Sequence, residues 1–426
     1  MRIAVIGAGW AGLACAVEAT RAGHRVTVFE AARTAGGRAR RIDGDAAGSG
    51  PPLDNGQHIL IGAYRETLAL MRTVGVDPRA VLLRLPLSLR RPDGGGLAVP
   101  AGWPAPLDLL AGIATARGWT WRDKASLLRG AWGWRRDGFR CADDATVRDL
   151  CAGLTPRAMD ELVDPLCVSA LNTPSDRASG QVFLSVLRDA LFGEAGGADL
   201  LLPRVDLGAL LPDAALAWLA DQGATVQRGK RVDVIGRGAA GGARWRVEGT
   251  DVDHVVLASA SWDAVRLLRD SAIVAPAWTD AAEALRFEAI ATVYLEGATP
   301  LAAPMLALRS SPDAPAQFAF DRTVLGGPDG RLALVVSAAD APRDVLERQV
   351  LAQARTALGQ PALRVLRTIV EKRATFACTP GLRRPGRDIA EAISACGDHV
   401  AGPYPATLEG AVRSGLAAAR AVPVAR

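Results

Sequence analysis

The segment RIAVIGAGWAGLACAVEATRAGHRVTVFE, residues 2–30, decides the fold of this 426-residue chain. Its pattern predicts an apolar strand, a glycine-rich turn, a helix of small residues and a second strand that ends in an acid: Arg2–Ile6, Gly7–Gly12, Ala11–Ala22, Arg25–Phe29 and Glu30. This order is typical of a Rossmann-type βαβ unit. We therefore predict an α/β fold whose parallel sheet starts with this segment.

The glycine-rich turn predicts a dinucleotide site. Gly7, Gly9 and Gly12 match the G-x-G-x-x-G fingerprint in full. The first glycine permits the tight turn, the second lets the backbone approach a pyrophosphate, and the third lets the helix pack closely on the strand. The helix N-terminus offers free N–H groups and a positive dipole end to the phosphates. Glu30 lies 18 residues beyond Gly12, where a carboxylate can accept from a ribose hydroxyl.

The composition is that of an ordinary globular enzyme and narrows the functional classes. A chain of 426 residues is long enough for two domains. The net charge is +5, but only three of the 50 basic residues are lysines and no basic stretch alternates with stacking aromatics, so we expect no nucleic-acid binding. The cysteines form no CxxC pair, so we expect no metal site and free thiols in a reducing compartment: Cys15, Cys141, Cys151, Cys167, Cys378 and Cys396.

The N-terminal segment differs from a signal peptide, although it is apolar and follows a basic residue. Its three glycines and the acidic Glu18 are unusual in the apolar core of such a peptide. No run of about 18 apolar residues occurs, so we expect no membrane-spanning helix. We therefore predict a cytoplasmic protein.

Beyond residue 30 the pattern predicts a chain that crosses between two regions. We expect helices over 64–74, 343–358 and 406–422, a mostly helical stretch over 143–220, and strands over 224–235, 244–258, 286–296, 331–338 and 365–370. We divide the chain into a nucleotide-binding domain of residues 1–85, 205–270 and 365–426, and a substrate domain of residues 86–204 and 271–364.

Two short motifs give the chain a family resemblance. Gly36-Gly37-Arg38 follows the second strand, and Gly397-Asp398 precedes the last helix. The pair resembles the flavin amine oxidase and phytoene desaturase superfamily. The resemblance implies FAD, held by a Rossmann-like domain that is interleaved with a substrate domain of mixed sheet and helices. It adds these residues to the glycines and Glu30 as FAD contacts: Ala11, Gly37, Arg38, Val232, Gly397, Asp398 and Thr407. The family usually has a Trp after Gly-Asp, where this chain has His399.

A longer stretch makes the resemblance more specific. Residues 53–67, LDNGQHILIGAYRET, are similar to the squalene-associated FAD-dependent desaturases, a family now described as hydroxysqualene dehydroxylases. Residues 164–174, 201–207 and 405–415 agree with the same family. A glycine between polar side chains suits a backbone that approaches a flat cofactor, so we add Gly56, Gln57 and His58 to the expected FAD contacts.

The resemblance implies that hydroxysqualene and reduced flavin give squalene, water and oxidised flavin. Such a reaction requires an acid near the hydroxyl group and a dry, apolar site for a lipophilic isoprenoid substrate. The candidate acids are His58, Tyr404 and Glu409. His58 can also fill the core, and Glu409 can instead bind the backbone or the ribityl chain. Asn172 and Thr173 can line the site or end a helix before Pro174. No motif identifies the electron donor.

Two other functional classes compete with this interpretation. The first is an oxidative relative, either an amine oxidase or a carotenoid-type desaturase. An amine oxidase needs an aromatic cage, which an aromatic content of 5% disfavours. The second is a subunit that binds a dinucleotide for structural reasons alone.

Residues 103–140 combine tryptophans with basic side chains. Five of the ten tryptophans lie here: Trp103, Trp119, Trp121, Trp132 and Trp134. Basic residues are interspersed among them: Arg117, Arg122, Lys124, Arg129, Arg135 and Arg136. This combination favours peripheral contact with the inner face of a membrane. The alternative is a substrate domain in which the tryptophans pack inward.

Overall fold

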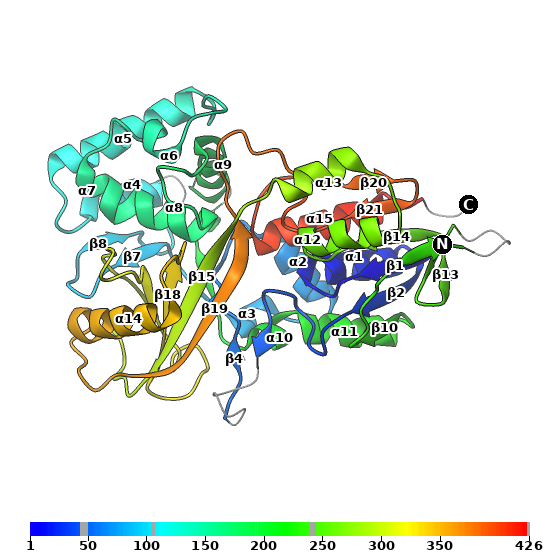
Figure 1. Ribbon diagram of the computed structural model, residues 1–426. Coiled ribbons are helices and arrows are strands. Elements are labelled where there is room, and N and C mark those ends of the chain that lie inside the picture. Colours follow the sequence, from blue (N-terminus) through cyan, green and yellow to red (C-terminus); the bar gives the residue numbers. More distant parts are fainter. Residues whose placement is uncertain (43–49, 104–106, 192, 194, 239–243, 424–426) are drawn as a thin grey trace.

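A six-stranded sheet forms the nucleotide-binding half of the computed structural model, which describes residues 1–42, 50–103, 107–191, 193, 195–238 and 244–423 (Figure 1). Its strand order is β10-β2-β1-β14-β21-β20. All neighbours are parallel except the last pair. The strands come from three distant segments: β1 (Arg2–Ile6) and β2 (Arg25–Glu30), β10 (Thr225–Arg228) and β14 (His254–Leu257), and β20 (Asp388–Ala390) and β21 (Ile393–Ala395).

Both faces of this sheet are covered, which explains why β1 is apolar from Ile3 to Ile6. Ile3 and Val5 face one core, formed with α1 (Trp10–Arg21), α2 (Arg65–Thr73), α11 (Pro212–Asp221) and α15 (Leu408–Arg420). Ala4 and Ile6 face the opposite core. That core is formed with helices α12 (Ser261–Asp270) and α13 (Pro276–Glu283) and a small sheet of β11 (Ile235–Arg237), β12 (Trp245–Val247) and β13 (Thr250–Val252).

The first and last helices of the chain are in direct contact. A Cβ atom on Gly415 of α15 would lie 2.1 Å from the carbonyl oxygen of Ala11 in α1. Only a residue without a side chain allows this approach. The C-terminal helix is therefore an integral part of the nucleotide-binding half.

The second half is built on an antiparallel sheet of order β16-β17-β18-β15-β19. The strands are β15 (Phe287–Glu296), β16 (Met305–Ala307), β17 (Phe318–Asp321), β18 (Arg331–Ser337) and β19 (Arg364–Phe376). Helix α14 (Arg343–Ala357) packs on one face with Ala291, Val293 and Leu295 of β15. In Figure 1, β15 and β19 run from the nucleotide-binding half to the outer end of the second half.

A group of helices covers the end of the second half (Figure 1). It comprises α4 (Leu107–Thr115), α5 (Trp121–Arg136), α6 (Val147–Leu150), α7 (Pro156–Ala158), the π-helix Met159–Val163, α8 (Asp164–Leu171) and α9 (Gly180–Leu191). Thr120 and Asp123 form a reciprocal capping box at the start of α5. Asn172, with a φ of 47°, ends α8 in the left-handed conformation.

Further short elements complete the fold. They are the sheet β5 (Leu60–Ile61), β9 (Leu200–Pro203) and β6 (Leu82–Leu85), the pairs β3 (Arg41–Ile42) with β4 (Leu53–Asp54) and β7 (Ser88–Arg90) with β8 (Gly96–Ala98), and the helices α3 (Pro78–Val81) and α10 (Leu207–Leu210). None of the described helices is long and apolar enough to cross a bilayer. All six cysteines lie in described segments as free thiols.

The predicted α/β fold and the first βαβ unit are confirmed, but several boundaries are wrong. The single strand expected over 224–235 is two strands, because Gly229, with a φ of 71°, ends β10. The strand expected over 244–258 is a hairpin followed by β14, because Gly249 turns the chain. β19 extends to Phe376 and pairs with β15, so residues 365–376 lie in the second sheet rather than in the nucleotide-binding half. The stretch 143–220, expected to be mostly helical, also contains β9.

Candidate active site and cofactor cleft

A cavity of about 540 Å³ connects the two halves. At one end it is lined by residues at the carboxyl ends of β1, β2 and β14, where ligands bind in open parallel sheets. At the other end it is lined by β15, β17, β18, β19 and α8 of the second half. A molecule that fills the cavity therefore touches both halves.

The glycine-rich turn has the geometry of a phosphate-binding loop. Gly7 has a φ of 117°, and a Cβ atom there would lie 2.6 Å from the carbonyl oxygen of Ala258. A Cβ atom on Gly12 would lie 1.9 Å from the oxygen of Gly7, so Gly12 lies in helix packing and does not line the cavity. Gly9 is the N-cap of α1 and, with Ala11, lines the cavity. The first turn of α1 therefore faces the cavity.

The acid at the end of β2 holds this turn in place. Glu30 Oε2 accepts the N–H of Ala8 at 2.7 Å, and Oε1 accepts that of Ala32 at 2.8 Å. Glu30 lines the cavity together with Val232 and Lys230 from the loop after β10. The contact of Glu30 with a ribose remains a prediction.

Arg38 and Asp398 form an ion pair, and both residues line the cavity. Arg38 also donates to the carbonyl oxygen of Ala374 in β19 at 2.7 Å. Burial by itself would raise the pKa of Asp398, but the charge of Arg38 and a hydrogen bond with His399 hold that pKa well below its ordinary value. The carboxylate is therefore ionised, and the two predicted motifs, Gly37-Arg38 and Gly397-Asp398, lie together.

His399 occupies the position where the family usually has Trp. Its ring lies over Gly397, where a Cβ atom would be 2.5 Å from His399 Cε1. The residue is 4% exposed and lines the cavity. Its Nε2 atom is buried without a hydrogen-bond partner among the described residues. A buried ring nitrogen of this kind requires a partner, which a bound molecule can supply.

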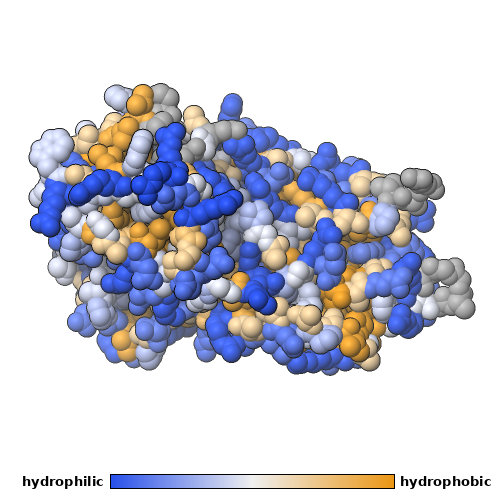
Figure 2. Space-filling view, turned by 90° about the horizontal axis from the view of Figure 1, so that it is seen from above, coloured by the Kyte–Doolittle hydropathy of each residue, from blue (hydrophilic) through white to orange (hydrophobic). Residues whose placement is uncertain are grey.

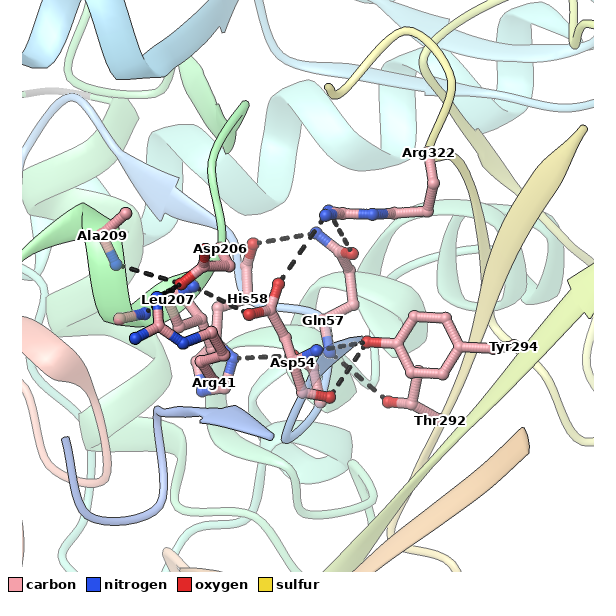
Figure 3. A network of polar contacts seen from close by, with 12 residues as sticks. Arg41, Asp54, Gln57, His58, Asp206, Leu207, Ala209, Thr292, Tyr294 and Arg322 are labelled. Atoms are coloured by element: carbon pink, nitrogen blue, oxygen red, sulfur yellow. Dashed lines mark hydrogen bonds and ion pairs between the residues drawn. The ribbon is translucent and has the colours of Figure 1, made fainter. Parts of the chain in front are cut away.

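Residues 54–58 belong to a buried polar network between the halves (Figure 3). Asp54 Oδ1 accepts the N–H of Leu207 at 2.8 Å, and Oδ2 lies 3.7 Å from Arg322 Nη2. Arg322 Nη1 donates to Gln57 Oε1 at 3.1 Å, and the Tyr294 hydroxyl donates to the Asp54 carbonyl at 3.0 Å. Burial raises the pKa of Asp54 to about 6, although Leu207 and Arg322 oppose the shift. Gly56, Gln57 and His58 line the cavity next to this network.

His58 is uncharged in this position. Its Nδ1 atom lies 3.1 Å from the carbonyl oxygen of Gly56, which assigns the ring proton to Nδ1. Burial lowers the pKa of His58, and the charge of Arg38 adds to this shift. His58 is thus a neutral imidazole that presents an acceptor nitrogen.

Tyr404 and Glu409, the other two candidate acids, are not among the residues that line the cavity. The Tyr404 ring packs edge-on against Tyr64 and under the guanidinium of Arg413. Burial, with a hydrogen bond to Asp189, raises the pKa of Tyr404 to about 12. Tyr404 therefore lies behind Tyr64, which does line the cavity.

Glu409 is fully buried and joins α15 to α2. Its carboxylate accepts the N–H groups of Glu66 and Thr67 at 3.1 and 2.9 Å and the Thr67 hydroxyl at 2.7 Å. Arg413 Nε donates to it at 2.7 Å. The structure thus shows Glu409 bound to the backbone, which is one of the two alternatives to a proton donor. Thr407, the N-cap of α15, does line the cavity.

Several cavity residues were not predicted. Asn55 and Tyr64 belong to the stretch that carries the family resemblance, and their place beside His58 was a usable signal. Glu371 lies in no local motif and comes from the middle of β19.

Asn172 ends α8 and also lines the cavity, and its amide donates to Thr375 at 2.9 Å. Both alternatives for Asn172 therefore hold.

The residues of the cavity fit a flavin dinucleotide. Within the described chain no side chain caps α1, so the first turn of this helix is available to phosphate oxygens. The two glycine loops approach so closely that a Cβ atom on Gly37 would lie 3.2 Å from Gly9 Cα, which leaves backbone alone at the cavity wall. His399 and Arg38 supply further polar atoms along the same wall. Within the described ranges no cluster of His, Cys, Asp or Glu could hold a metal ion.

Comparisons with known proteins agree with this geometry. The family model of the flavin containing amine oxidoreductases matches residues 10–423. A hydroxysqualene dehydroxylase of Rhodopseudomonas palustris is 30% identical over 443 aligned residues, which cover 97% of this chain and 96% of that protein. A zeta-carotene desaturase of a Synechocystis species is 42% identical, but over 18% of this chain and 15% of its own.

The solved structures give the same fold. An oxidoreductase from Methanosarcina mazei superimposes with a TM-score of 0.72 at 18% identity, covering 98% of this chain and 99% of its own. The family match extends over nearly the whole chain and includes both halves of the cavity. This chain therefore belongs to the flavin containing amine oxidoreductase family, and it is an oxidoreductase whose cofactor is FAD.

Proposed function

We propose that this protein reductively removes the hydroxyl group of hydroxysqualene and releases squalene and water. The observation that carries the proposal is the similarity to a hydroxysqualene dehydroxylase across both halves of the chain. The desaturase similarity covers a much smaller part, so it supports the superfamily rather than an oxidative reaction. The substrate class is a lipophilic isoprenoid.

The far end of the cavity suits a hydrocarbon. Ile290, Phe318, Phe320, Val335 and Ile369 line it and come from four strands of the second sheet. Burial of an isoprenoid chain against such side chains contributes roughly 25 cal/mol per Å² of apolar surface. The same side chains exclude water from the reacting carbon, which would otherwise capture a cation.

The polar residues near the centre of the cavity have two functions in this proposal. Arg38, Asp398 and the first turn of α1 hold FAD, and the network around Asp54 fixes Gln57 and His58 beside it. When bound and reduced, FAD supplies the hydride. The substrate alcohol is allylic, so loss of its protonated hydroxyl leaves a delocalised cation in the dry part of the cavity.

We further propose that the protein takes its substrate from a membrane surface, to which it binds through residues 103–140. Six of the nine large hydrophobic side chains exposed in the described segments lie here: Trp103, Leu107, Leu110, Trp121, Leu128 and Trp132. Figure 2 shows apolar surface at the end of the molecule that carries the covering helices, and further apolar patches on the other half. Residues 104–106 lie outside the described residues.

Some tryptophans of this segment are exposed, as membrane contact requires, and one packs inward. Trp121 and Trp132 are 83% and 71% exposed, and with Leu128 they form one stripe along α5 at spacings of seven and four residues. Exposed arginines lie on the same helix: Arg122, Arg129, Arg135 and Arg136. Trp119 instead is buried and donates to Glu161 at 2.8 Å. The outward stripe with its cations suits an anionic bilayer surface.

The proposed reaction is tested by an anaerobic turnover. Flavin-loaded protein is reduced with dithionite and mixed with hydroxysqualene while the flavin absorbance is recorded, and the lipids are then extracted. Reoxidation with formation of squalene is expected, and free reduced flavin without protein is the control. If the flavin stays reduced with hydroxysqualene, and oxidised protein is instead reduced by a carotenoid precursor or an amine, the reaction is oxidative and the proposal is wrong.

A further inference from the structure

One carboxyl group of the cavity belongs to the second half of the molecule. Glu371 lies on the same face of β19 as Ile369, two residues earlier, and both line the cavity. Its partner across the strand pair is Ile290 of β15, which also lines the cavity. Glu371 therefore places a polar group within the apolar part of the site.

The other carboxyl groups that line the cavity lie in the nucleotide-binding half and are engaged. Glu30 accepts two backbone N–H groups, Asp398 pairs with Arg38, and Asp263 lies 3.7 Å from Arg231. Among the described residues of the lining, Glu371 is the carboxyl group that the second sheet contributes. A substrate at the apolar end is accordingly near Glu371.

Asn55 fixes the orientation of this carboxyl group. Asn55 Nδ2 donates to Glu371 Oε2 at 3.1 Å and to the carbonyl oxygen of Arg38 at 2.8 Å. Glu371 Oε1 accepts the N–H of Arg373 over a longer distance of 3.4 Å. One oxygen is thus held by a buried amide, while the other is the less strongly bound of the two.

The three candidate acids from the sequence are poorly suited to protonate a substrate. His58 is a neutral imidazole with its proton directed at Gly56. Tyr404 lies outside the cavity lining, and Glu409 is saturated by hydrogen bonds from α2 and Arg413. Glu371 combines a carboxyl group with a position in the site.

We propose that Glu371 is the proton donor to the leaving hydroxyl group, an inference that rests on the proposed dehydroxylation. The Glu371 carboxyl transfers its proton to the hydroxyl oxygen, and the carbon–oxygen bond breaks with both electrons leaving on water. The allylic carbon then takes up the hydride that the proposed function already includes. The Glu371 carboxylate produced in the step regains a proton from solvent before the next turnover, so atoms and charge balance.

The charges around Glu371 come from several elements. Lys372 and Arg373 follow it on β19, and Arg38, His58 and Asp398 line the same cavity. After proton transfer the negative charge of the Glu371 carboxylate also stabilises the positive charge on the substrate. Glu371 should therefore favour binding of a positively charged ligand, which can be measured without turnover.

The first experiment measures single turnovers with Glu371→Gln, which keeps the shape but has no acidic proton. We expect the rate of squalene formation by the reduced protein to fall by about 10²–10⁴-fold. The control is Glu296→Gln, because Glu296 lies at the far end of β15 in an exposed ion pair with Arg364. Its rate should equal that of the unaltered protein. A Glu371→Gln rate within threefold of the unaltered protein would overturn the proposal.

The second experiment measures binding to the oxidised protein, with no turnover. The probes are hydroxysqualene and an analogue in which an ammonium group replaces the hydroxyl group, and flavin absorbance reports their binding. Glu371→Gln should weaken binding of the ammonium analogue at least tenfold and leave that of hydroxysqualene within threefold. Equal loss of both probes, or of neither, contradicts a role at the reacting carbon. If the unaltered protein does not turn over hydroxysqualene, the proposed function fails, whereas this binding comparison still tests Glu371.

Discussion

The two ends of the cavity are built in opposite ways. At the nucleotide end the wall of the cavity is formed by main-chain atoms. Side chains at Gly7, Gly12 or Gly36 would collide with neighbouring main-chain atoms. At the substrate end the wall is side chain, contributed by four strands and α8. One end therefore tolerates almost no change of residue at its glycines, while the other can change its ligand by exchanging side chains. Such a division allows one cofactor-binding fold to serve different substrates.

The largest effect is expected at the backbone end. Gly12→Val places a branched side chain where even a Cβ atom would lie 1.9 Å from the Gly7 oxygen. We expect loss of FAD from the purified protein and about 3 kcal/mol or more of destabilisation, measured by flavin absorbance and thermal unfolding. Gly133→Ala in α5 is the control, because no described atom lies within 4 Å of its added Cβ. That variant should be as stable as the unaltered protein or slightly more stable. A Gly12→Val protein that is stable and retains FAD would contradict the statement that the nucleotide end tolerates almost no change at its glycines.

The next effect is expected at the ion pair of Arg38 with Asp398. Arg38→Ala leaves Asp398 buried without its partner, which costs about 3 kcal/mol. Because the pKa of Asp398 is depressed in the folded protein, its contribution is present above the ordinary carboxyl pKa and is lost as the pH falls below about 4. Chemical unfolding at a series of pH values should show this acid-side loss in the unaltered protein but not in Arg38→Ala. Arg40→Ala, in the same loop but at an exposed hydrogen bond, is the control.

Asp54 gives a smaller effect of the opposite sign. Its pKa is raised to about 6, so the folded state favours the protonated form, and stability decreases as the pH rises from about 4 to about 6. Asp54→Asn should remove this decrease, a gain of about 2–3 kcal/mol above pH 6. The unfolding free energy of both proteins over pH 4–8 provides the measurement. A variant with the unaltered pH dependence would show that Arg322 keeps Asp54 ionised.

The smallest effect on stability is expected on the outer helices. Trp121→Ser combined with Trp132→Ser should change the unfolding free energy by less than about 0.5 kcal/mol, because both side chains are exposed. Co-sedimentation with phosphatidylglycerol vesicles should fall severalfold. Val274→Ser, at an 86% exposed residue outside this segment, is the control. Unchanged vesicle binding would contradict the proposed membrane contact.

The sequence predicted the backbone end better than the side-chain end for a physical reason. Gly7, Gly9 and Gly12 act within one turn, so their spacing alone specifies the structure, and the family and FAD are confirmed. Arg38 and Asp398 could be identified through resemblance, since no local pattern connects them. Glu371 and Phe320 reach the cavity only when the strands of the second sheet pair with one another. No fixed spacing in the sequence shows which strands pair. For Glu409 the sequence left a proton donor and a backbone ligand as alternatives, because an acid at a helix start gives no sign of what it binds.

The ion pair of Arg38 with Asp398 joins residues that are 360 positions apart. During synthesis at 5–20 residues per second, roughly 20–70 s separate their appearance. During the first part of this interval the βαβ unit lacks β14, and until its end the unit lacks β21 or α15, which complete its sheet and its core. The nascent chain therefore carries an incomplete sheet with an uncovered apolar face, and it cannot close the FAD site until α15 has left the ribosome. FAD binding therefore follows the synthesis of α15, and until then the uncovered apolar face exposes the nascent chain to aggregation.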